Sequence, residues 1–307
     1  MSITPPARLP RLTAARVALT QSIEAVNENG ERQAVSIPAE RSLTVYVDKR
    51  ELVTLMTLGA RPELLVLGYL RNQRLVRSAS EVESITVDWD VGVAAVKTRH
   101  GVSDIEQRTA KRVVTTGCGQ GSMFGDLMDE VDQLVLPHAR LTQSELYGIV
   151  DTIRLQDSTY KSAGSVHGCA LFRGQQLLVF VEDVGRHNAI DTIAGWMWLH
   201  GDDDTLAPTP ASAAMRGDAG HSAAMTGADK VFYTTGRLTS EMVIKSAQMG
   251  IPIVVSRSGI TQMGHAVAHD LGLCTIGRAT HKRFLCFTGA QRLQLQAGLV
   301  GPRLRAA

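Results

Sequence analysis

The residue best placed to do chemistry is a cysteine in a glycine-rich stretch. Residues 113–124 read Val-Val-Thr-Thr-Gly-Cys-Gly-Gln-Gly-Ser-Met-Phe, so Cys118 follows a short β-branched run and has glycine on either side. Glycine accepts backbone angles that other residues resist, and this composition predicts an exposed, mobile loop after a strand. A thiol that solvent reaches can ionise and act as a nucleophile. An isolated cysteine could equally be a small filler in a turn, because free cysteine is usually buried.

Two later loops carry residue types that suit an anion. Residues 234–241 read Thr-Thr-Gly-Arg-Leu-Thr-Ser-Glu and residues 256–261 read Ser-Arg-Ser-Gly-Ile-Thr, each between a predicted strand and a predicted helix. Hydroxyls, glycine and arginine at a helix start suit a phosphate. Capping alone would explain one such loop, but two in consecutive strand–helix units, each with an arginine, favour a phosphate-bearing ligand. The candidate binding residues here are Arg237, Thr239, Ser256, Arg257 and Thr261.

A third polar loop, residues 182–188, reads Glu-Asp-Val-Gly-Arg-His-Asn between a predicted strand and a predicted helix. Ligands of α/β sheets bind beyond the carboxyl ends of strands, so this loop is also a candidate. A structural role is the alternative, in which Asp183 caps the helix and Arg186 pairs with Glu182. The sequence leaves both open.

Metal and standard nucleotide sites have less support. His167 and Cys169 share one face of a predicted strand, but zinc needs more ligands at fixed spacing, and the His-x-Glu and Pro-Cys-x-x-Cys pattern of zinc deaminases is absent from the sequence. The sequence also has neither a Walker A loop nor a GxGxxG motif.

The composition indicates an ordinary globular protein. The 307 residues are 44% hydrophobic and 20% charged, and a net charge of +2 without a dense basic block argues against nucleic acid as a partner. The four cysteines show no CxxC spacing, which favours a reducing compartment. We find neither a signal-peptide core nor an apolar run of about 20 residues, so we expect a cytoplasmic protein without a membrane partner.

The elements that must position these residues divide into two predicted domains. We expect a flexible tail over residues 1–14, a strand-rich N-terminal domain with the Cys118 loop over 15–140, and an α/β domain over 141–307. Asn29-Gly30 predicts a hairpin, and the apolar face of residues 61–75 predicts a helix.

Strands and helices alternate in the second predicted domain. Thr142 and Glu145 have capping-box spacing before an apolar stripe, which predicts a helix over residues 142–156. The later alternation favours an α/β sheet covered on both faces. Residues 201–228, rich in Asp, Ala, Pro, Gly and Ser, are expected to form a disordered surface insertion.

With these motifs in view, the chain resembles the FdhD family, the sulfur carriers required for formate dehydrogenase activity. The resemblance spans roughly residues 34–290, and its most specific parts are residues 115–119 (TTGCG), 182–191 (EDVGRHNAID), 235–242 (TGRLTSEM) and 256–261. It implies a cytidine-deaminase-like three-layer α/β core without the zinc, with a smaller strand-rich N-terminal part, and a homodimer.

The resemblance also implies a sulfurtransferase reaction. A cysteine desulfurase would pass sulfur to Cys118 as a persulfide, and the protein would deliver it to the molybdenum of a bis-molybdopterin guanine dinucleotide cofactor used by formate dehydrogenase. A guanine nucleotide could mimic part of that ligand. The cofactor segment of the family aligns with Arg278, Ala279, Thr280, His281, Lys282 and Arg283.

The chain departs from the family pattern at two points. Many members have a second cysteine three residues after the first, where this chain has Gly121, and the segment 278–283 lacks the usual Phe-x-Arg opening. The missing cysteine keeps open an alternative, a chaperone that binds the molybdenum cofactor without persulfide chemistry. A zinc hydrolase on a deaminase-like fold is a third possibility.

Overall fold

The computed structural model describes residues 9–102, 105, 112–115, 121–124, 134–200 and 225–299. Cys118 and residues 201–224 of the predicted insertion lie outside the described residues. The chain forms two compact units: unit 1 takes Met1–Glu130, Ser158–Gly168 and Val181–Thr226, and unit 2 takes Val131–Asp157, Cys169–Phe180 and Gly227–Ala307. Each unit therefore contains residues from before and after the predicted domain boundary at residue 140. That boundary stays a prediction.

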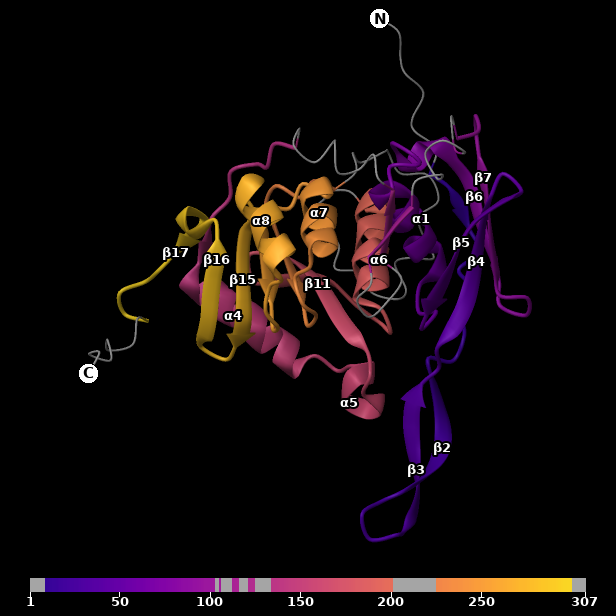
Figure 1. Ribbon diagram of the computed structural model, residues 1–307, viewed down its shortest axis with the longest axis horizontal. Coiled ribbons are helices and arrows are strands. Elements are labelled where there is room, and N and C mark those ends of the chain that lie inside the picture. Colours follow the sequence, from indigo (N-terminus) through magenta and orange to yellow (C-terminus); the bar gives the residue numbers. More distant parts are fainter. Residues whose placement is uncertain are drawn as a thin grey trace, which may run out of the picture. The chain divides into compact units, whose positions relative to one another are not determined.

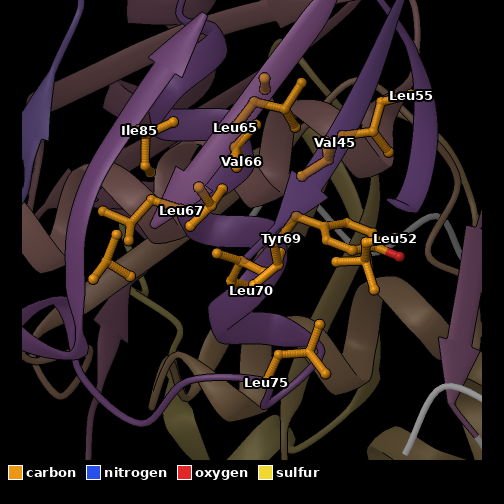
Figure 2. Close-up of a cluster of buried hydrophobic side chains, with 14 of the residues drawn as sticks. Val45, Leu52, Leu55, Leu65, Val66, Leu67, Tyr69, Leu70, Leu75 and Ile85 are labelled. Carbon is orange, nitrogen blue, oxygen red and sulfur yellow. The ribbon is translucent and has the colours of Figure 1, made fainter. Parts of the chain in front are cut away.

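Unit 1 is built on a five-stranded mixed sheet in the order β1-β6-β7-β4-β5. Its alternating apolar side chains face helix α1 (Pro62–Asn72), and Figure 2 shows Leu65 and Leu70 of that helix in one buried cluster with Val45 and Ile85 of the sheet. The predicted helix over residues 61–75 is confirmed within a few residues. The strands are β1 (Arg11–Leu12), β4 (Arg41–Val47), β5 (Arg50–Thr57), β6 (Val82–Asp88) and β7 (Val93–Thr98), and the 3-10 turn η1 (Ala79–Glu81) precedes β6.

The first strand departs from the predicted tail. Residues Arg11–Leu12 pair in parallel with β6, and the hydroxyl of Thr13 donates to the carbonyl of Ile85 at 3.1 Å and accepts from the amide of Val87 at 2.9 Å. The prediction of a loose tail over residues 1–14 is therefore wrong for this segment, because an existing strand edge supplies the partners that the local sequence lacks.

Helices α1 and α6 (Arg186–Leu199) of unit 1 pack closely at a glycine. A Cβ atom at Gly68 would stand 1.6 Å from the carbonyl oxygen of Asp191, so no other residue fits there unless the helices separate. Asn72 of α1 donates from its side-chain amide to a carboxylate oxygen of Asp191 at 2.7 Å, and Arg71 donates to the carbonyl of Ala194 at 2.8 Å. The contact therefore combines close backbone approach with polar ties.

Two hairpins complete unit 1. β2 (Thr20–Val26) and β3 (Arg32–Pro38) pair in antiparallel register around Asn29-Gly30, which confirms that prediction, and they form a two-stranded ribbon (Figure 1). β8 (Arg112–Thr115) and β9 (Gly121–Phe124) form a second two-stranded sheet in which Thr115 is opposite Gly121. Cys118 falls between these two strands in the sequence.

Unit 2 contains a six-stranded sheet in the order β12-β11-β13-β14-β15-β16. β13, β14 and β15 are parallel to one another, whereas β11 and β16 run antiparallel to their neighbours β13 and β15. The strands are β11 (His167–Arg173), β12 (Gln176–Asp183), β13 (Lys230–Thr234), β14 (Ile253–Ser256), β15 (Cys274–Thr280) and β16 (Arg283–Thr288).

Helices cover both faces of this sheet. α4 (Gln143–Leu155) begins with the predicted capping box of Thr142 and Glu145, and its apolar stripe shares one buried cluster with side chains of β11, β13, β14 and β15. α7 (Ser240–Gln248) and α8 (Gln262–Asp270) form the crossovers between the parallel strands on the face away from that cluster, and they lie side by side (Figure 1). The predicted α/β fold is confirmed.

Short elements fill the connections. α5 (Thr159–Ala163) precedes β11, and β10 (Leu141–Thr142) pairs in parallel with β17 (Leu293–Gln294), which follows the 3-10 turn η3 (Ala290–Arg292). Among the described residues, no helix has the length and apolar character to cross a bilayer.

The close approach at Gly68 generates a stability prediction. We expect Gly68→Ala to lower the free energy of unfolding by about 1–3 kcal/mol, because the added methyl group forces α1 away from α6. Gly298→Ala is the control, since nothing lies within 4 Å of a Cβ atom there. Chemical denaturation checks both, and equal midpoints for the two variants would refute the close contact.

Candidate functional site

Three loops of unit 2 lie at one edge of the sheet. Because β13, β14 and β15 are parallel, their carboxyl ends, Thr234, Ser256 and Thr280, lie at the same edge. The loops predicted at residues 234–241 and 256–261 leave the sheet there, and the segment 278–283 ends β15 there. The fold therefore brings all three predicted cofactor-binding segments to one edge of the sheet, although they are separate in the sequence.

Backbone hydrogen bonds join the first two loops to each other. Leu238 and Ile260 form a parallel bridge beyond the ends of the strands, in which Leu238 donates to the carbonyl of Gly259 at 2.9 Å and Thr261 donates to the carbonyl of Leu238 at 3.0 Å. The amide of Arg257 donates to the carbonyl of Thr234 at 3.0 Å. The loops therefore form one connected surface.

Ser256 connects the two loops through its side chain. Its hydroxyl donates to the carbonyl of Gly236 at 2.7 Å and accepts from the amide of Ser258 at 2.9 Å, and the residue is fully buried. Because the only hydroxyl proton of Ser256 is donated within the protein, its side chain holds the two loops together. Its predicted role as a ligand-binding residue stays a prediction.

The two threonines at the helix starts differ. Thr261 caps α8 by accepting from the amide of Gly264 at 3.2 Å, whereas Thr239 precedes α7 without a side-chain capping bond. The hydroxyl oxygen of Thr239 is buried and has no hydrogen-bond partner within the described part of the chain. A buried polar atom without a partner has a cost in free energy, and a ligand that hydrogen-bonds to Thr239 would remove that cost.

Three arginines give this edge a positive charge. Arg237, Arg257 and Arg278 are exposed, and their guanidinium groups make no hydrogen bond or ion pair with other described residues. Burial raises the pKa of Tyr233 to about 12, and the charge of Arg257 acts in the opposite direction, so this guanidinium lies close enough to affect the phenol. Guanidinium groups without partners are suited to bind phosphate oxygens in pairs.

The end of β15 is tied to the second loop by a close approach. A Cβ atom at Gly277 would stand 2.8 Å from the carbonyl oxygen of Ser258, and the amide of Arg278 donates to that oxygen at 2.7 Å. Gly277 was not among the predicted site residues, although a glycine inside a strand pattern is a known signal of close backbone approach.

The segment after Gly277 turns sharply. Arg278 and His281 have φ of 51° and 52°, in the left-handed region that non-glycine residues rarely adopt. Thr280 pairs with Arg283 across the turn, so His281 and Lys282 are at its tip, and these two residues and Arg283 are exposed. Ala279 is buried, and its side chain is part of the core cluster of unit 2. The segment therefore presents cations while its alanine anchors it.

The third polar loop belongs to unit 1, and its carboxylates hold neighbouring backbone segments together through hydrogen bonds. The carboxylate of Asp183 accepts from the Thr57 hydroxyl at 2.5 Å, the Asn188 side-chain amide at 2.9 Å, and the backbone amides of Leu58 and Gly185 at 3.2 Å. Burial raises the pKa of Asp183, and these four donors act against that shift. Nearby, Glu182 accepts from the first amides of α5. Both carboxylates are therefore engaged in holding backbone segments.

Known proteins similar to this chain agree on one family. A model of the FdhD/NarQ family matches residues 38–294. Sulfur carrier protein FdhD of Bacillus pumilus (strain SAFR-032) is 27% identical over 83% of this chain and 88% of its own length. The protein of the same name from Bacillus subtilis (strain 168) is 27% identical over 87% of this chain and 94% of its own length.

A solved structure has the same fold. The chain described as a formate dehydrogenase accessory protein from Desulfotalea psychrophila aligns with a TM-score of 0.66 and 23% identity, over 89% of this chain and 98% of that one. This similarity supports the α/β architecture described above.

The connecting role of Ser256 can be tested by comparison with its neighbour. We expect Ser256→Ala to lower the free energy of unfolding by about 1–3 kcal/mol, because the carbonyl of Gly236 and the amide of Ser258 lose their partner. Ser258→Ala is the matched control, since its hydroxyl makes no hydrogen bond to described residues. If thermal or chemical denaturation gives the same loss for both serines, the connection is not made through this hydroxyl.

Proposed function

Because the chain belongs to the FdhD/NarQ family, we propose that it is a sulfurtransferase that accepts persulfide sulfur on Cys118 and delivers it to the molybdenum cofactor of formate dehydrogenase. The family match over residues 38–294 carries this proposal, since it includes Cys118 and the three loops of the candidate site. The relatives named as sulfur carriers cover most of the chain and support the same role.

The proposed first step moves one sulfur atom between two thiols. The thiolate of Cys118 attacks the terminal sulfur of a persulfide on a cysteine desulfurase, the sulfur–sulfur bond of the donor breaks, and the donor cysteine leaves as a thiolate. Cys118 then carries the persulfide, and no net oxidation or reduction occurs. In support, Cys169 and Cys274 are buried, which limits their access to a donor protein.

The proposed acceptor is bis-molybdopterin guanine dinucleotide, bound as a substrate of the transfer. Its phosphates need cations and hydrogen-bond donors, and the edge of the unit 2 sheet offers Arg237, Arg257 and Arg278 together with the amino ends of α7 and α8. The hydroxyl of Thr239, buried without a partner, would gain one from a phosphate or a sugar. These residues bind and orient the substrate, and the chemistry at the metal belongs to the substrate itself.

The turn of the β15–β16 hairpin extends the same positive surface. Lys282 and Arg283 are exposed there beside His281. A large anion bound at the arginines of the two loops would be attracted to these cations too. We therefore assign the segment 278–283 to the substrate-binding surface, with Ala279 as its buried anchor.

A chaperone that holds the cofactor without forming a persulfide is the second candidate. Gly121, which begins β9, occupies the place of the second family cysteine, so the chain has no neighbouring thiol at that position to resolve a persulfide. A relay with one cysteine needs no such partner, because the sulfur leaves directly to the acceptor. The proposed partners are a cysteine desulfurase, formate dehydrogenase and a second copy of the chain, in the cytoplasm.

Sulfur loading on Cys118 can be measured directly. After incubation with a cysteine desulfurase and cysteine, we expect mass spectrometry to find one additional sulfur atom on the peptide that contains Cys118, and none on Cys118→Ser. Cys169→Ser is the control and should load like the parent, because Cys169 is buried beside Thr234. If the parent protein gains no sulfur but still binds the cofactor, the chaperone is the correct function.

The anion-binding role of the loops generates a second measurement. We expect Arg237→Ala or Arg257→Ala to weaken binding of a guanine nucleotide by about 1.5–3 kcal/mol, which is roughly 10- to 150-fold in Kd, because each removes a charged hydrogen bond. Arg154→Ala, on the exposed surface of α4, is the matched control and should bind normally. Isothermal titration calorimetry of the folded variants decides, and unchanged affinity in both loop variants would contradict the site.

A further inference from the structure

Two cysteines that the proposed function does not use lie next to each other in unit 2. Cys274 is the first residue of β15 and Cys286 is in β16, and their sulfur atoms are 4.0 Å apart. The spacing of the cysteines in the sequence gave no sign of a pair. Strand pairing brings them together, since residues of an antiparallel hairpin that are far apart in sequence become neighbours.

The hairpin geometry allows a bond between these two sulfurs. Ile276 is opposite Cys286 and Thr275 is opposite Thr288, with an irregularity between these two pairs. Cys274 is two residues before Ile276, so its side chain is on the same face as that of Cys286. A disulfide needs a sulfur–sulfur distance of about 2.05 Å, so the two atoms must approach by roughly 2 Å. β16 is an edge strand of the sheet, which leaves room for that movement.

The surroundings make the two thiols unequal. Cys274 is fully buried in the core cluster, whereas Cys286 is half-buried at its border. Either sulfur can be the donor in the contact between the two thiols, and the thiol of Cys286 also donates to the carbonyl of Thr288 at 3.3 Å. The contact with Cys274 lowers the pKa of Cys286, whereas the contact with Cys286 together with burial raises the pKa of Cys274. A half-buried thiol beside a fully buried one suits thiol–disulfide exchange, because only the first can be reached by a small disulfide.

We propose that Cys274 and Cys286 form a thiol–disulfide exchange site that reacts with low-molecular-weight disulfides. The thiolate of Cys286 attacks one sulfur of the disulfide, whose other half leaves as a thiol after taking up a proton. Cys274 then gives up its proton and attacks the sulfur of Cys286 in the mixed disulfide, and the second half leaves. The two cysteines are oxidised to one disulfide by loss of two electrons and two protons, and the small disulfide is reduced to two thiols.

The oxidised site would connect β15 and β16 on both sides of the turn that carries the segment 278–283. A covalent link between residues 274 and 286 closes a short loop around this turn, and such a link restricts the motion of the chain between its ends. The proposed exchange uses only Cys274 and Cys286, so it does not depend on whether Cys118 carries persulfide sulfur.

The test uses the full-length Cys118→Ser variant, so that the thiol of the sulfur-carrying loop does not contribute. The folded protein is treated with oxidised glutathione, free thiols are blocked, and digested peptides are examined by mass spectrometry without reduction. We expect one cross-linked peptide pair joining Cys274 to Cys286, which dithiothreitol reverses, with the circular dichroism spectrum unchanged. Absence of the cross-link, or its formation only after unfolding, would overturn the proposal.

Single substitutions in the same background separate the two roles. With Cys274→Ser we expect a stable glutathione adduct to accumulate on Cys286, because no second thiol displaces it. With Cys286→Ser we expect Cys274 to stay unmodified, since it is buried. Cys169→Ser should form the cross-link at the rate of the parent. An adduct on Cys274 in the Cys286→Ser protein, or an adduct on Cys286 that Cys274 never displaces, would show that the two thiols do not act as a pair.

Discussion

The parallel alignment of β13, β14 and β15 is the constraint on which the candidate site depends. Parallel strands place their carboxyl ends at one edge, so each crossover must return to the opposite edge through a helix before the next strand begins. Two consecutive crossovers therefore deliver two helix starts and two loops to the same place, and β15 adds its own end beside them. Arg237, Arg257 and Arg278 gather there for this topological reason, while the backbone bonds from Leu238 and Ser258 fix their spacing.

This edge keeps features that a purely structural surface would avoid. Three guanidinium groups of like charge sit on connected loops, Arg278 has a left-handed backbone, and the hydroxyl of Thr239 is buried without a partner among the described residues. Each of these raises the free energy of the folded protein. The backbone hydrogen bonds between the loops and the hydrogen bond of the buried Ser256 hydroxyl offset part of this free energy. Left-handed residues and buried polar atoms without a hydrogen-bond partner also occur elsewhere in the described residues, so it is their coincidence with three exposed arginines that makes this edge the candidate site.

The sequence predicts the elements of this fold well because their signals are local. The capping box at Thr142, the hairpin at Asn29-Gly30 and the alternation of strands with helices each depend on neighbouring residues, and the structure confirms them. Such local signals could not predict contacts between segments that are distant in the sequence. Asp183 accepts a hydrogen bond from Thr57, which is more than a hundred residues earlier in the chain, and β1 forms by pairing with the edge of β6. The choice between ligand and structural roles for the loop at residues 182–188 therefore came only with the fold.

The described cysteines show the same limit for chemistry. The sequence does not distinguish Cys274 from Cys286, since neither has a partner at a recognisable spacing, and it sets Cys169 apart only by its neighbour His167. The fold gives Cys169 a hydrogen bond to Thr234 inside the sheet, gives Cys274 a place in the core, and leaves Cys286 half-buried on an edge strand beside it. Reactivity of a thiol depends on its ionisation and its access, and both depend on these surroundings. Strand pairing thus gives the three described cysteines three different environments. Among them, only Cys274 and Cys286 are in contact, and they differ in solvent exposure in a way that suits disulfide exchange.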